Sequence, residues 1–365
     1  MIPSEDPLVQ PQPVISSVSP INARYQDEIT VRGANFSRVK EYNHLSINGI
    51  EVDITACSRD ELKFRMPFLP AGSYKIDLQV GGYKVTGGQQ INFLSAWEQL
   101  PDLPFETSES FLMNFNGDII VAASANYNDL ITNRKSIYRY DPDKREFSPL
   151  GSNISCRAPY HGLVVKGDKA YISRSTGSIL QVLDVFDRNT LTLSRVSDLP
   201  VSESFYCWLM DGDSILLAGV GTTHLKFNPI TGKWTKLKDL PGETTQGHVF
   251  TIAGRNFIIT SQQRLYEYIP AEDRWLQKSW PSFTMYYHGF DETVVCNDKA
   301  YVCSTYADYL HLSVYDPVTD TWESMNNIVF HLPWGKVFAF SLEEKLFLKG
   351  GNDYYDFWSF DTSWE

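Results

Sequence analysis

The sequence lacks several features that would point to particular functions. Lys and Arg number 32 against 44 Asp and Glu, so the chain has a net charge of −12 and no basic excess for nucleic acid or an anionic membrane. No apolar run approaches the ~18 residues of a transmembrane helix. The five cysteines contain no C-x-x-C pair, which leaves no zinc or redox motif, and they are predicted to be mostly buried free thiols.

Catalytic motifs are missing as well. Seven histidines are present, but no H-E-x-x-H or G-x-S-x-G accompanies them. Metal-ligand residues do not gather at short spacing, so the sequence predicts no metal site, no cofactor and no catalytic residue. A non-enzymatic protein is the favoured interpretation, although polar side chains at a binding site would be enough for an isomerase.

The N-terminal part of the chain reads as a polar segment followed by short strands. Residues 1–12 carry Pro and Gln and are predicted to be a flexible tether. The segments "PVISSVSP", "ITVRGANF", "LKFRMP" and "AGSYKIDLQVGG" then alternate apolar and polar residues between Pro and Gly stops, which predicts a β-sandwich. Asn48-Gly49 predicts a two-residue hairpin turn. Residues 13–94 resemble an IPT/TIG domain, which implies an immunoglobulin-like fold that serves as a spacer.

A second pattern recurs from Trp97 onward. Segments such as "THLKFNPITGKW", "RLYEYIPAEDRW" and "LSVYDPVTDTW" each follow two apolar strands joined by a tight turn, as in "VVCNDKAYVCS". Consecutive segment ends are 50, 46, 41, 41, 47 and 42 residues apart, and a period in the forties predicts six four-stranded blades. The end positions are Trp97, Phe147, Leu193, Trp234, Trp275, Trp322 and Trp364.

The two ends of the repeat region indicate how a ring would close. The strand that follows each earlier aromatic residue is absent after Trp364 and is present instead as "WEQLPDLP" at 97–104. Strand 97–104 is therefore predicted to complete the last blade. Residues 95–365 resemble the kelch-repeat β-propellers, although the double glycine of that family survives only as Gly350-Gly351. The expected fold is all-β, with an IPT/TIG sandwich followed by a six-bladed kelch-like β-propeller.

The candidate binding residues lie where the innermost strand of each blade is predicted to begin, because propellers usually bind ligands at the mouth of the channel. These stretches combine aromatic residues with nearby basic side chains. Flat rings with polar edges can stack on sugar rings, and neighbouring donors can bind the hydroxyl groups. The predicted ligand-binding residues are Arg157, Tyr160, His161, Tyr206, His248, Tyr287, His288 and Trp334.

The pairing of the two modules resembles surface proteins of Bacteroidetes that capture glycans. This resemblance implies a carbohydrate or another small polar ligand, and outer-membrane partner proteins. It also implies an extracellular or outer-membrane location with a lipid anchor, the signal peptide and lipidated Cys preceding this sequence. Two alternatives stay open: a sugar mutarotase or epimerase, similar to the sialic acid mutarotases of the kelch type, and a propeller that binds other proteins.

Overall fold

The computed structural model divides the chain into two compact units, Met1–Gln99 and Leu100–Glu365. Their regular structure is almost entirely β, and the only helices in the described part of the chain are the 3₁₀ turns η1 (Lys40–Tyr42) and η2 (Pro270–Glu272). The described residues are 11–67, 69–124, 134–155, 160–175, 181–200, 205–219, 221–242, 248–283, 292–306, 309–325, 338–349 and 356–363.

The first unit is a sandwich of two sheets, with strand orders β1-β3-β7-β6 and β2-β9-β8-β4-β5. Alternation sends every second side chain inward, so residues such as Ile29, Leu45, Phe64 and Ile76 from both sheets form one buried core. The strands are β1 (Val14–Ser19), β2 (Asn22–Ala23), β3 (Glu28–Ala34), β4 (Asn43–Ile47), β5 (Ile50–Glu51), β6 (Ile54–Cys57), β7 (Glu61–Arg65), β8 (Gly72–Val80) and β9 (Tyr83–Phe93).

The predicted hairpin at Asn48-Gly49 is confirmed. Ile47 pairs with Ile50, and Asn48 and Gly49 have φ values of 51° and 78°. Positive φ at both central residues is the geometry of a two-residue hairpin turn, which Asn and Gly adopt at little cost.

The second unit consists of six four-stranded sheets, which we number in chain order. The first is β11 (Glu106–Phe115), β12 (Asp118–Ser124), β13 (Arg134–Asp141) and β14 (Glu146–Ser155). The second is β15 (Tyr160–Lys166), β16 (Lys169–Ser175), β17 (Gln181–Asp187) and β18 (Thr192–Asp198). The third is β19 (Phe205–Asp211), β20 (Ser214–Gly219), β21 (His224–Asn228) and β22 (Lys233–Lys236).

The remaining three sheets follow the same order, except that the sixth takes its outermost strand from an earlier part of the chain. The fourth sheet is β23 (His248–Ile252), β24 (Arg255–Thr260), β25 (Arg264–Ile269) and β26 (Arg274–Gln277). The fifth is β27 (Glu292–Cys296), β28 (Lys299–Tyr306), β29 (Tyr309–Asp316) and β30 (Thr321–Met325). The sixth is β31 (Ala339–Leu342), β32 (Lys345–Lys349), β33 (Phe357–Asp361) and β10 (Trp97–Leu100), which lies beside β33.

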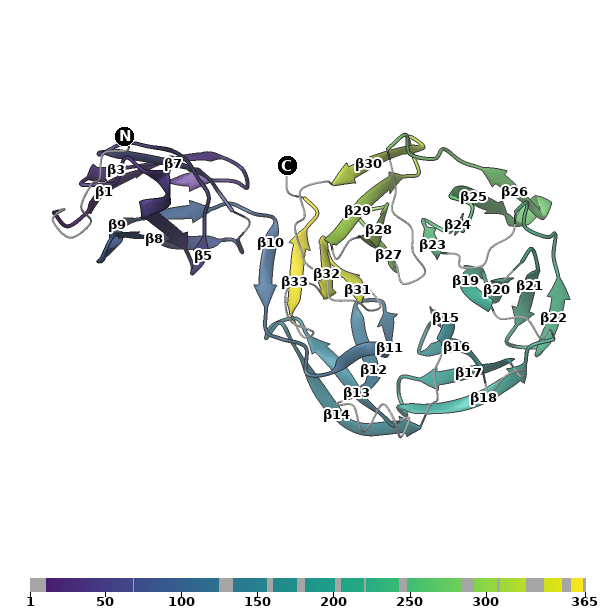
Figure 1. Cartoon of the computed structure of the whole chain (residues 1–365). Coiled ribbons are helices and arrows are strands. Elements are labelled where there is room, and N and C mark those ends of the chain that lie inside the picture. The colour runs from purple at the N-terminus through teal and green to yellow at the C-terminus, as the bar shows by residue number, and fades with distance from the viewer. Residues whose placement is uncertain are drawn as a thin grey trace. The chain divides into compact units, whose positions relative to one another are not determined.

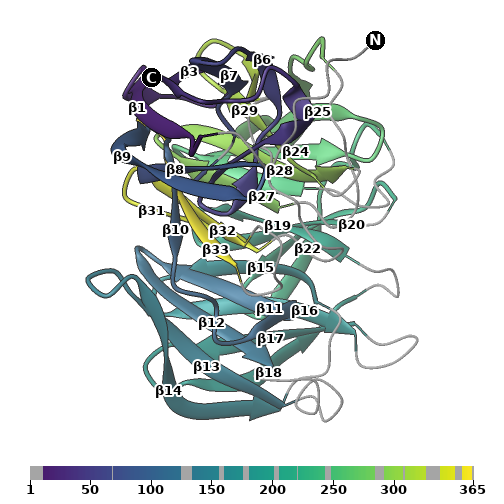
Figure 2. The same ribbon diagram turned by 60° about the vertical axis from the view of Figure 1, so that its left-hand side comes forward.

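The six sheets lie around a common centre, with the first strand of each sheet innermost (Figure 1). Within the first sheet, the strands follow one another outward from β11 to β14 (Figure 2). Successive first strands contact each other from β11 to β31. The sixth sheet packs on the first through an aromatic cluster, in which the ring centroids of Tyr140 and Phe347 are 5.3 Å apart and those of Phe105 and Phe338 are 5.8 Å apart.

The repeat is visible in the turns as well as in the strand order. The turn between the third and fourth strands contains one residue with positive φ in each of the first five sheets. The positive-φ residues are Arg145, Leu191, Gly232, Asp273 and Asp320. In the fifth sheet, the tight turn expected in "VVCNDKAYVCS" is the two-residue turn Asn297–Asp298, which pairs Cys296 with Lys299. In the described residues, Cys57, Cys296 and Cys303 are free thiols.

Candidate ligand-binding site

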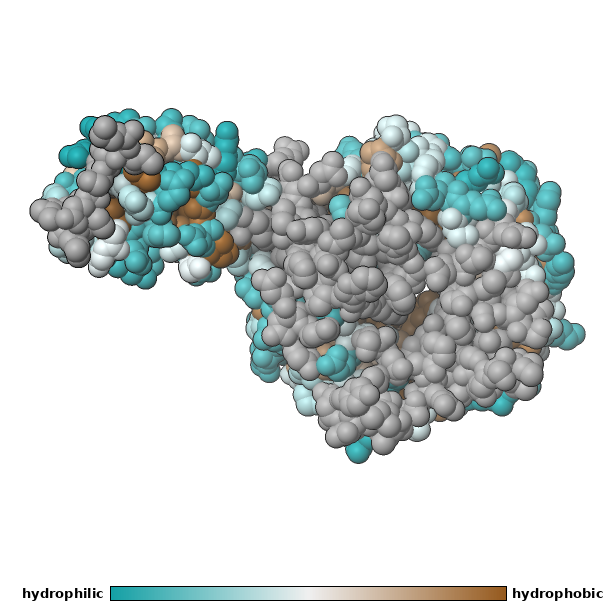
Figure 3. Space-filling view, viewed as in Figure 1, coloured by the Kyte–Doolittle hydropathy of each residue, from teal (hydrophilic) through white to brown (hydrophobic). Residues whose placement is uncertain are grey.

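The centre of the second unit is the candidate site. Each first strand hydrogen-bonds to only one neighbour within its sheet, so its other edge faces the centre. The space-filling surface is hollowed there, and hydrophobic surface is visible inside the hollow (Figure 3). All six sheets share one strand order, so the first strands begin at the same end of this centre.

Most of the predicted binding residues fall outside the part of the chain that the structure describes. Tyr160, His161 and Tyr206 lie on first strands, but their side chains are outside the described set. His248 is the member whose side chain is described; it begins β23 and is half-buried. The predicted residues that lie wholly outside the described residues are Arg157, Tyr287, His288 and Trp334.

Strand register makes the six first strands comparable. In each of the six sheets, the fifth residue of the second strand pairs with one residue of the first strand. We call these six positions on the first strands the upper rung. The upper rung contains Phe111, Gly162, Cys207, His248, Glu292 and Phe338. The next residue along each strand forms the second rung, which contains Leu112, Leu163, Trp208, Val249, Thr293 and Ala339.

The upper rung has an apolar part and a polar part. Phe111 and Phe338, on the adjacent first and sixth sheets, are buried. His248 and Glu292, on the adjacent fourth and fifth sheets, are half-buried, and their strands β23 and β27 contact each other. An imidazole and a carboxylate therefore occupy positions where these other sheets carry rings. The imidazole and the carboxylate are groups that can form hydrogen bonds, whereas the two rings pack in the cores between sheets.

Sequence reasoning did not identify Glu292. The predicted start of the fifth inner strand, "TMYYHG" (284–289), lies outside the described residues, and the described part of that strand, β27, begins at Glu292. The signal was present in the turn at Asn297–Asp298, because counting back from Cys296 along the paired strand leads to Glu292. The repeat alone does not give the register between strands, and that register is needed to place Glu292 on the upper rung.

A lysine distinguishes the junction of the sixth and first sheets. Lys349 is the fifth residue of β32 and is buried, whereas the equivalent residues of the other sheets are small or apolar. Its backbone N–H donates a hydrogen bond to the Phe338 carbonyl at 2.9 Å. Burial lowers the pKa of Lys349, and the nearby negative charge of Glu106 partly opposes this effect. The equivalent residues are Ala122, Ser173, Ala218, Ile259 and Cys303.

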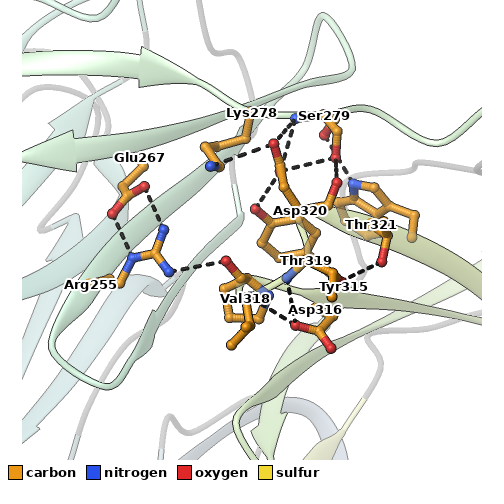
Figure 4. Close-up of polar contacts among 12 residues, drawn as sticks. Arg255, Glu267, Lys278, Ser279, Tyr315, Asp316, Val318, Thr319, Asp320 and Thr321 are labelled. Carbon is orange, nitrogen blue, oxygen red and sulfur yellow. Dashed lines mark hydrogen bonds and ion pairs between the residues drawn. The ribbon is translucent and has the colours of Figure 1, made fainter.

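The outer strands carry a different polar arrangement, shown for the fourth and fifth sheets in Figure 4. The Asp320 carboxylate accepts hydrogen bonds from the Tyr315 hydroxyl at 2.8 Å and the Ser279 backbone N–H at 3.1 Å. The Trp322 indole N–H donates to the Ser279 carbonyl at 3.0 Å. Ser279 follows the fourth sheet and Asp320 belongs to the fifth, so these bonds join neighbouring sheets. We call this arrangement the aspartate tie.

The aspartate tie shifts the pKa values of its members. Burial raises the pKa of Tyr315, and its hydrogen bond to Asp320 adds to this effect. Burial also disfavours the Asp320 carboxylate, but the hydrogen bonds from Tyr315 and Ser279 outweigh it and lower the Asp320 pKa. Beside the tie, Arg255 binds Glu267 at 2.7 and 2.8 Å and donates to the Pro317 carbonyl at 3.1 Å (Figure 4).

The same tie recurs between the third and fourth sheets. Asp273 accepts hydrogen bonds from the Tyr268 hydroxyl at 2.8 Å and the Lys238 backbone N–H at 3.1 Å, and the Trp275 indole donates to the Lys238 carbonyl at 3.3 Å. In the turn that joins the third and fourth strands of the third sheet, Gly232 takes the place of the aspartate. The tie thus joins sheets at two successive junctions, and its residues lie on outer strands, far from the upper rung in the strand order.

A buried histidine lies next to the Asp273 tie. His224 has no exposed surface, its Nδ1 is 3.3 Å from the Lys238 carbonyl, and its Nε2 has no hydrogen-bond partner in the described residues. Burial lowers the pKa of His224 to about 4. Its ring packs against Tyr268 and Trp275. The residues at the same register in the other sheets are Ile137, Leu183, Leu265, Leu312 and Phe357.

No group of three or more His, Cys, Asp or Glu side chains is arranged to hold a metal ion within the described ranges. No helix in that part of the chain is long and apolar enough to cross a membrane.

Comparisons with known proteins identify the first module and a fold. Residues 13–93 match the sequence model of the IPT/TIG domain, so the prediction of this domain is confirmed. No curated protein matches the sequence significantly. The whole chain resembles an auxiliary nutrient binding protein from Bacteroides thetaiotaomicron VPI-5482, with a TM-score of 0.59, 11% identity, and coverage of 97% of this chain and 98% of that chain.

Two further solved structures have similar coverage. An auxiliary nutrient binding protein from Bacteroides ovatus ATCC 8483 has a TM-score of 0.51 and 11% identity, covering 96% of this chain and 98% of that chain. A candidate phosphatase from Bacteroides thetaiotaomicron VPI-5482 has a TM-score of 0.55 and 8% identity, covering 98% of both chains. Identities this low show a shared fold and leave the function to be argued from the site.

Proposed function

We propose that residues 95–365 form a closed six-bladed kelch-type β-propeller that captures a carbohydrate at its mouth without transforming it. Support for the architecture comes from the six equivalent sheets around one centre, from β10 beside β33, and from the aromatic cluster between the sixth and first sheets. Residues 1–12 would be the tether and residues 13–94 the spacer that holds the mouth away from a cell surface.

The observation that carries the binding proposal is the composition of the upper rung. His248 and Glu292, both half-buried, place hydrogen-bonding groups on neighbouring strands, whereas Phe111 and Phe338 at the same register are buried in the cores between sheets. A sugar ring has polar edges that such groups can bind, and an apolar face on which aromatic rings can stack. The aromatic residues predicted around the mouth, Tyr287 and Trp334 among them, would add stacking surface.

A surface location with a lipid anchor, and outer-membrane partner proteins, belong to the same proposal. They are supported by the module pairing noted in the sequence and by the nutrient binding proteins of Bacteroides that share the fold. Fractionation of cells that express the native gene, with detection of the protein at the surface by protease treatment, tests this part.

The binding proposal is tested by screening the whole chain against a glycan array and measuring the hits by isothermal titration calorimetry. We expect a dissociation constant below about 1 mM for at least one oligosaccharide. Trp334→Ala and Tyr287→Ala are expected to weaken it at least ~10-fold, because each stacked ring contributes on the order of 1 kcal/mol or more. The exposed Val318→Ala is the control. If no glycan binds at millimolar concentration, the proposal is wrong.

A second candidate function is an isomerase of the mutarotase or epimerase type. It is favoured by one observation: His248 and Glu292 place an imidazole and a carboxylate on adjacent strands, and such groups can act as general acid and base. Following the anomers of a bound reducing sugar by NMR distinguishes the two functions. Acceleration that His248→Ala abolishes would establish the enzyme, and binding without acceleration would support simple capture.

A further inference from the structure

The chain contains two Asn-Gly pairs, Asn48-Gly49 and Asn116-Gly117, and both form two-residue hairpin turns. All four residues have positive φ, at 51° and 78° in the first turn and at 53° and 92° in the second, and all four are exposed. The two turns therefore share a sequence and a backbone conformation, but their surroundings differ.

Asparagine is a chemically labile residue, and a following glycine makes it more so. The glycine nitrogen attacks the asparagine side-chain carbonyl carbon and loses its proton to solvent. A bond forms between these two atoms, and the Cγ–Nδ2 bond breaks to release ammonia. Water then opens the resulting succinimide ring and leaves aspartate or isoaspartate. Glycine favours the attack because it has no side chain to block the approach of its nitrogen.

The nitrogen of Gly49 is accessible. Its N–H donates no hydrogen bond within the described residues, and a Cβ placed on Gly49 would meet no atom within 4 Å. The strand that follows, β5, consists of Ile50 and Glu51, which are both exposed, and it forms the edge of its sheet beside β4. Opening this hairpin breaks two strand pairings and exposes no core residue, so its free-energy cost is small.

The second turn is held closed. The Gly117 N–H donates to the Asn114 side-chain oxygen at 2.8 Å, and the Asn114 amide donates to the Ser341 carbonyl of the sixth sheet at 3.2 Å. A Cβ placed on Gly117 would lie 3.4 Å from Leu342. The turn follows the buried Phe115 and joins strands of ten and seven residues, so opening it would expose core side chains.

We propose that Asn48 is a site of spontaneous deamidation in the folded protein and that Asn116 is protected. The product carries a carboxylate at the tip of the hairpin, close in sequence to Glu51, so the edge of the IPT/TIG domain gains one negative charge. In the isoaspartate form the backbone also gains a carbon atom, which changes the geometry of the two-residue turn. The modification lies in the first unit and is independent of the proposed carbohydrate capture.

Peptide mapping by mass spectrometry of the whole chain tests this proposal, because it follows the conversion of amide to acid at both sites in one sample. At mildly alkaline pH and physiological temperature, Asn48 is expected to convert at least ~10-fold faster than Asn116, since the contacts that hold Gly117 must break first. The control is the same incubation in concentrated urea, where both turns are unfolded and the two rates should agree within about 3-fold.

The variant Asn114→Ala tests the cause of the protection. It frees the Gly117 N–H and is expected to accelerate conversion of Asn116 about 3-fold or more, while Asn48 keeps its rate. Thermal unfolding shows whether this variant is folded. Equal rates at the two sites in the folded wild type, or conversion of Asn48 in urea but not in the folded chain, would overturn the proposal. An unchanged rate at Asn116 in Asn114→Ala would overturn the assigned protection.

Discussion

The outer strands and the upper rung of the second unit differ in how closely they follow the repeat. Asp320 joins the fifth sheet to the fourth with the same contacts that Asp273 makes one sheet earlier. On the upper rung, by contrast, equivalent positions carry Phe, Gly, His and Glu. The contacts of Asp273 and Asp320, which join sheets at two successive junctions, are explained by folding alone. Positions that vary while the backbone repeats are therefore the better candidates for binding, and each region predicts a different response to mutation.

The largest expected effect on stability comes from His224 as the pH falls. Its folded-state pKa of about 4 lies below the unfolded value of 6.5, so the unfolded state binds the proton first. The stability contributed by neutral His224 is complete above pH 6.5 and is lost as the pH falls toward 4. The expected loss between pH 7 and pH 4 is about 3 kcal/mol.

Urea unfolding of the wild type and His224→Leu across this pH range measures the effect. Leucine matches the residues at the same register in three other sheets, Leu183, Leu265 and Leu312. The difference in unfolding free energy between the two proteins should change with pH in favour of the leucine variant. Parallel pH profiles would show that His224 does not act in this way.

The aspartate tie predicts the next largest effect. Asp320→Gly reproduces the third sheet, where Gly232 occupies the equivalent turn position, and it retains the positive φ of the turn. The variant removes the acceptor of the Tyr315 hydroxyl and of the Ser279 N–H, so we expect a loss of about 2 kcal/mol in unfolding free energy.

Asp316→Ala is the matched control for the tie. Asp316 accepts hydrogen bonds from the backbone of Val318 and Thr319 within its own turn, so its loss should cost about 0.5–1 kcal/mol. Equal losses from both variants would contradict a tie between sheets.

The smallest effect concerns Thr293 on the second rung. Its hydroxyl oxygen is buried without a hydrogen-bond partner in the described residues, and Leu112 and Val249 occupy the same rung. Thr293→Val should stabilise the protein by about 1 kcal/mol, because the shape is retained and an unpaired polar atom is removed. Thr251→Val is the comparison: it removes a hydroxyl that donates to Asn256 at 2.8 Å, and no gain is expected.

The sequence predicted the parts of the structure that depend on local pattern. The Asn48-Gly49 hairpin, the turn at Asn297–Asp298 and the pairing of an early strand with the last sheet are all visible in short stretches or in their spacing. Trp322, which ends one of the repeated segments, contacts Ser279 and Trp280 of the preceding repeat.

The candidate site was less predictable because it depends on register between strands. The aromatic composition led to the prediction of Tyr287 and His288, which precede β27 in the sequence. It did not lead to Glu292, the first residue of β27. The unusual character of Glu292, Lys349 and His224 appears only when equivalent positions in the sheets are aligned through their pairing. Each of them looks ordinary in the linear sequence.

The most direct test of the account measures stability and sugar affinity on the same two variants. Asp320→Gly should lower the unfolding free energy by about 2 kcal/mol and leave the affinity for a neutral oligosaccharide within 2-fold of the wild type. Glu292→Gln should do the reverse, with unchanged stability and an affinity reduced about 10-fold or more. If both variants lose affinity together, or Glu292→Gln binds like the wild type, the separation of a repeated scaffold from a variable binding rung is wrong.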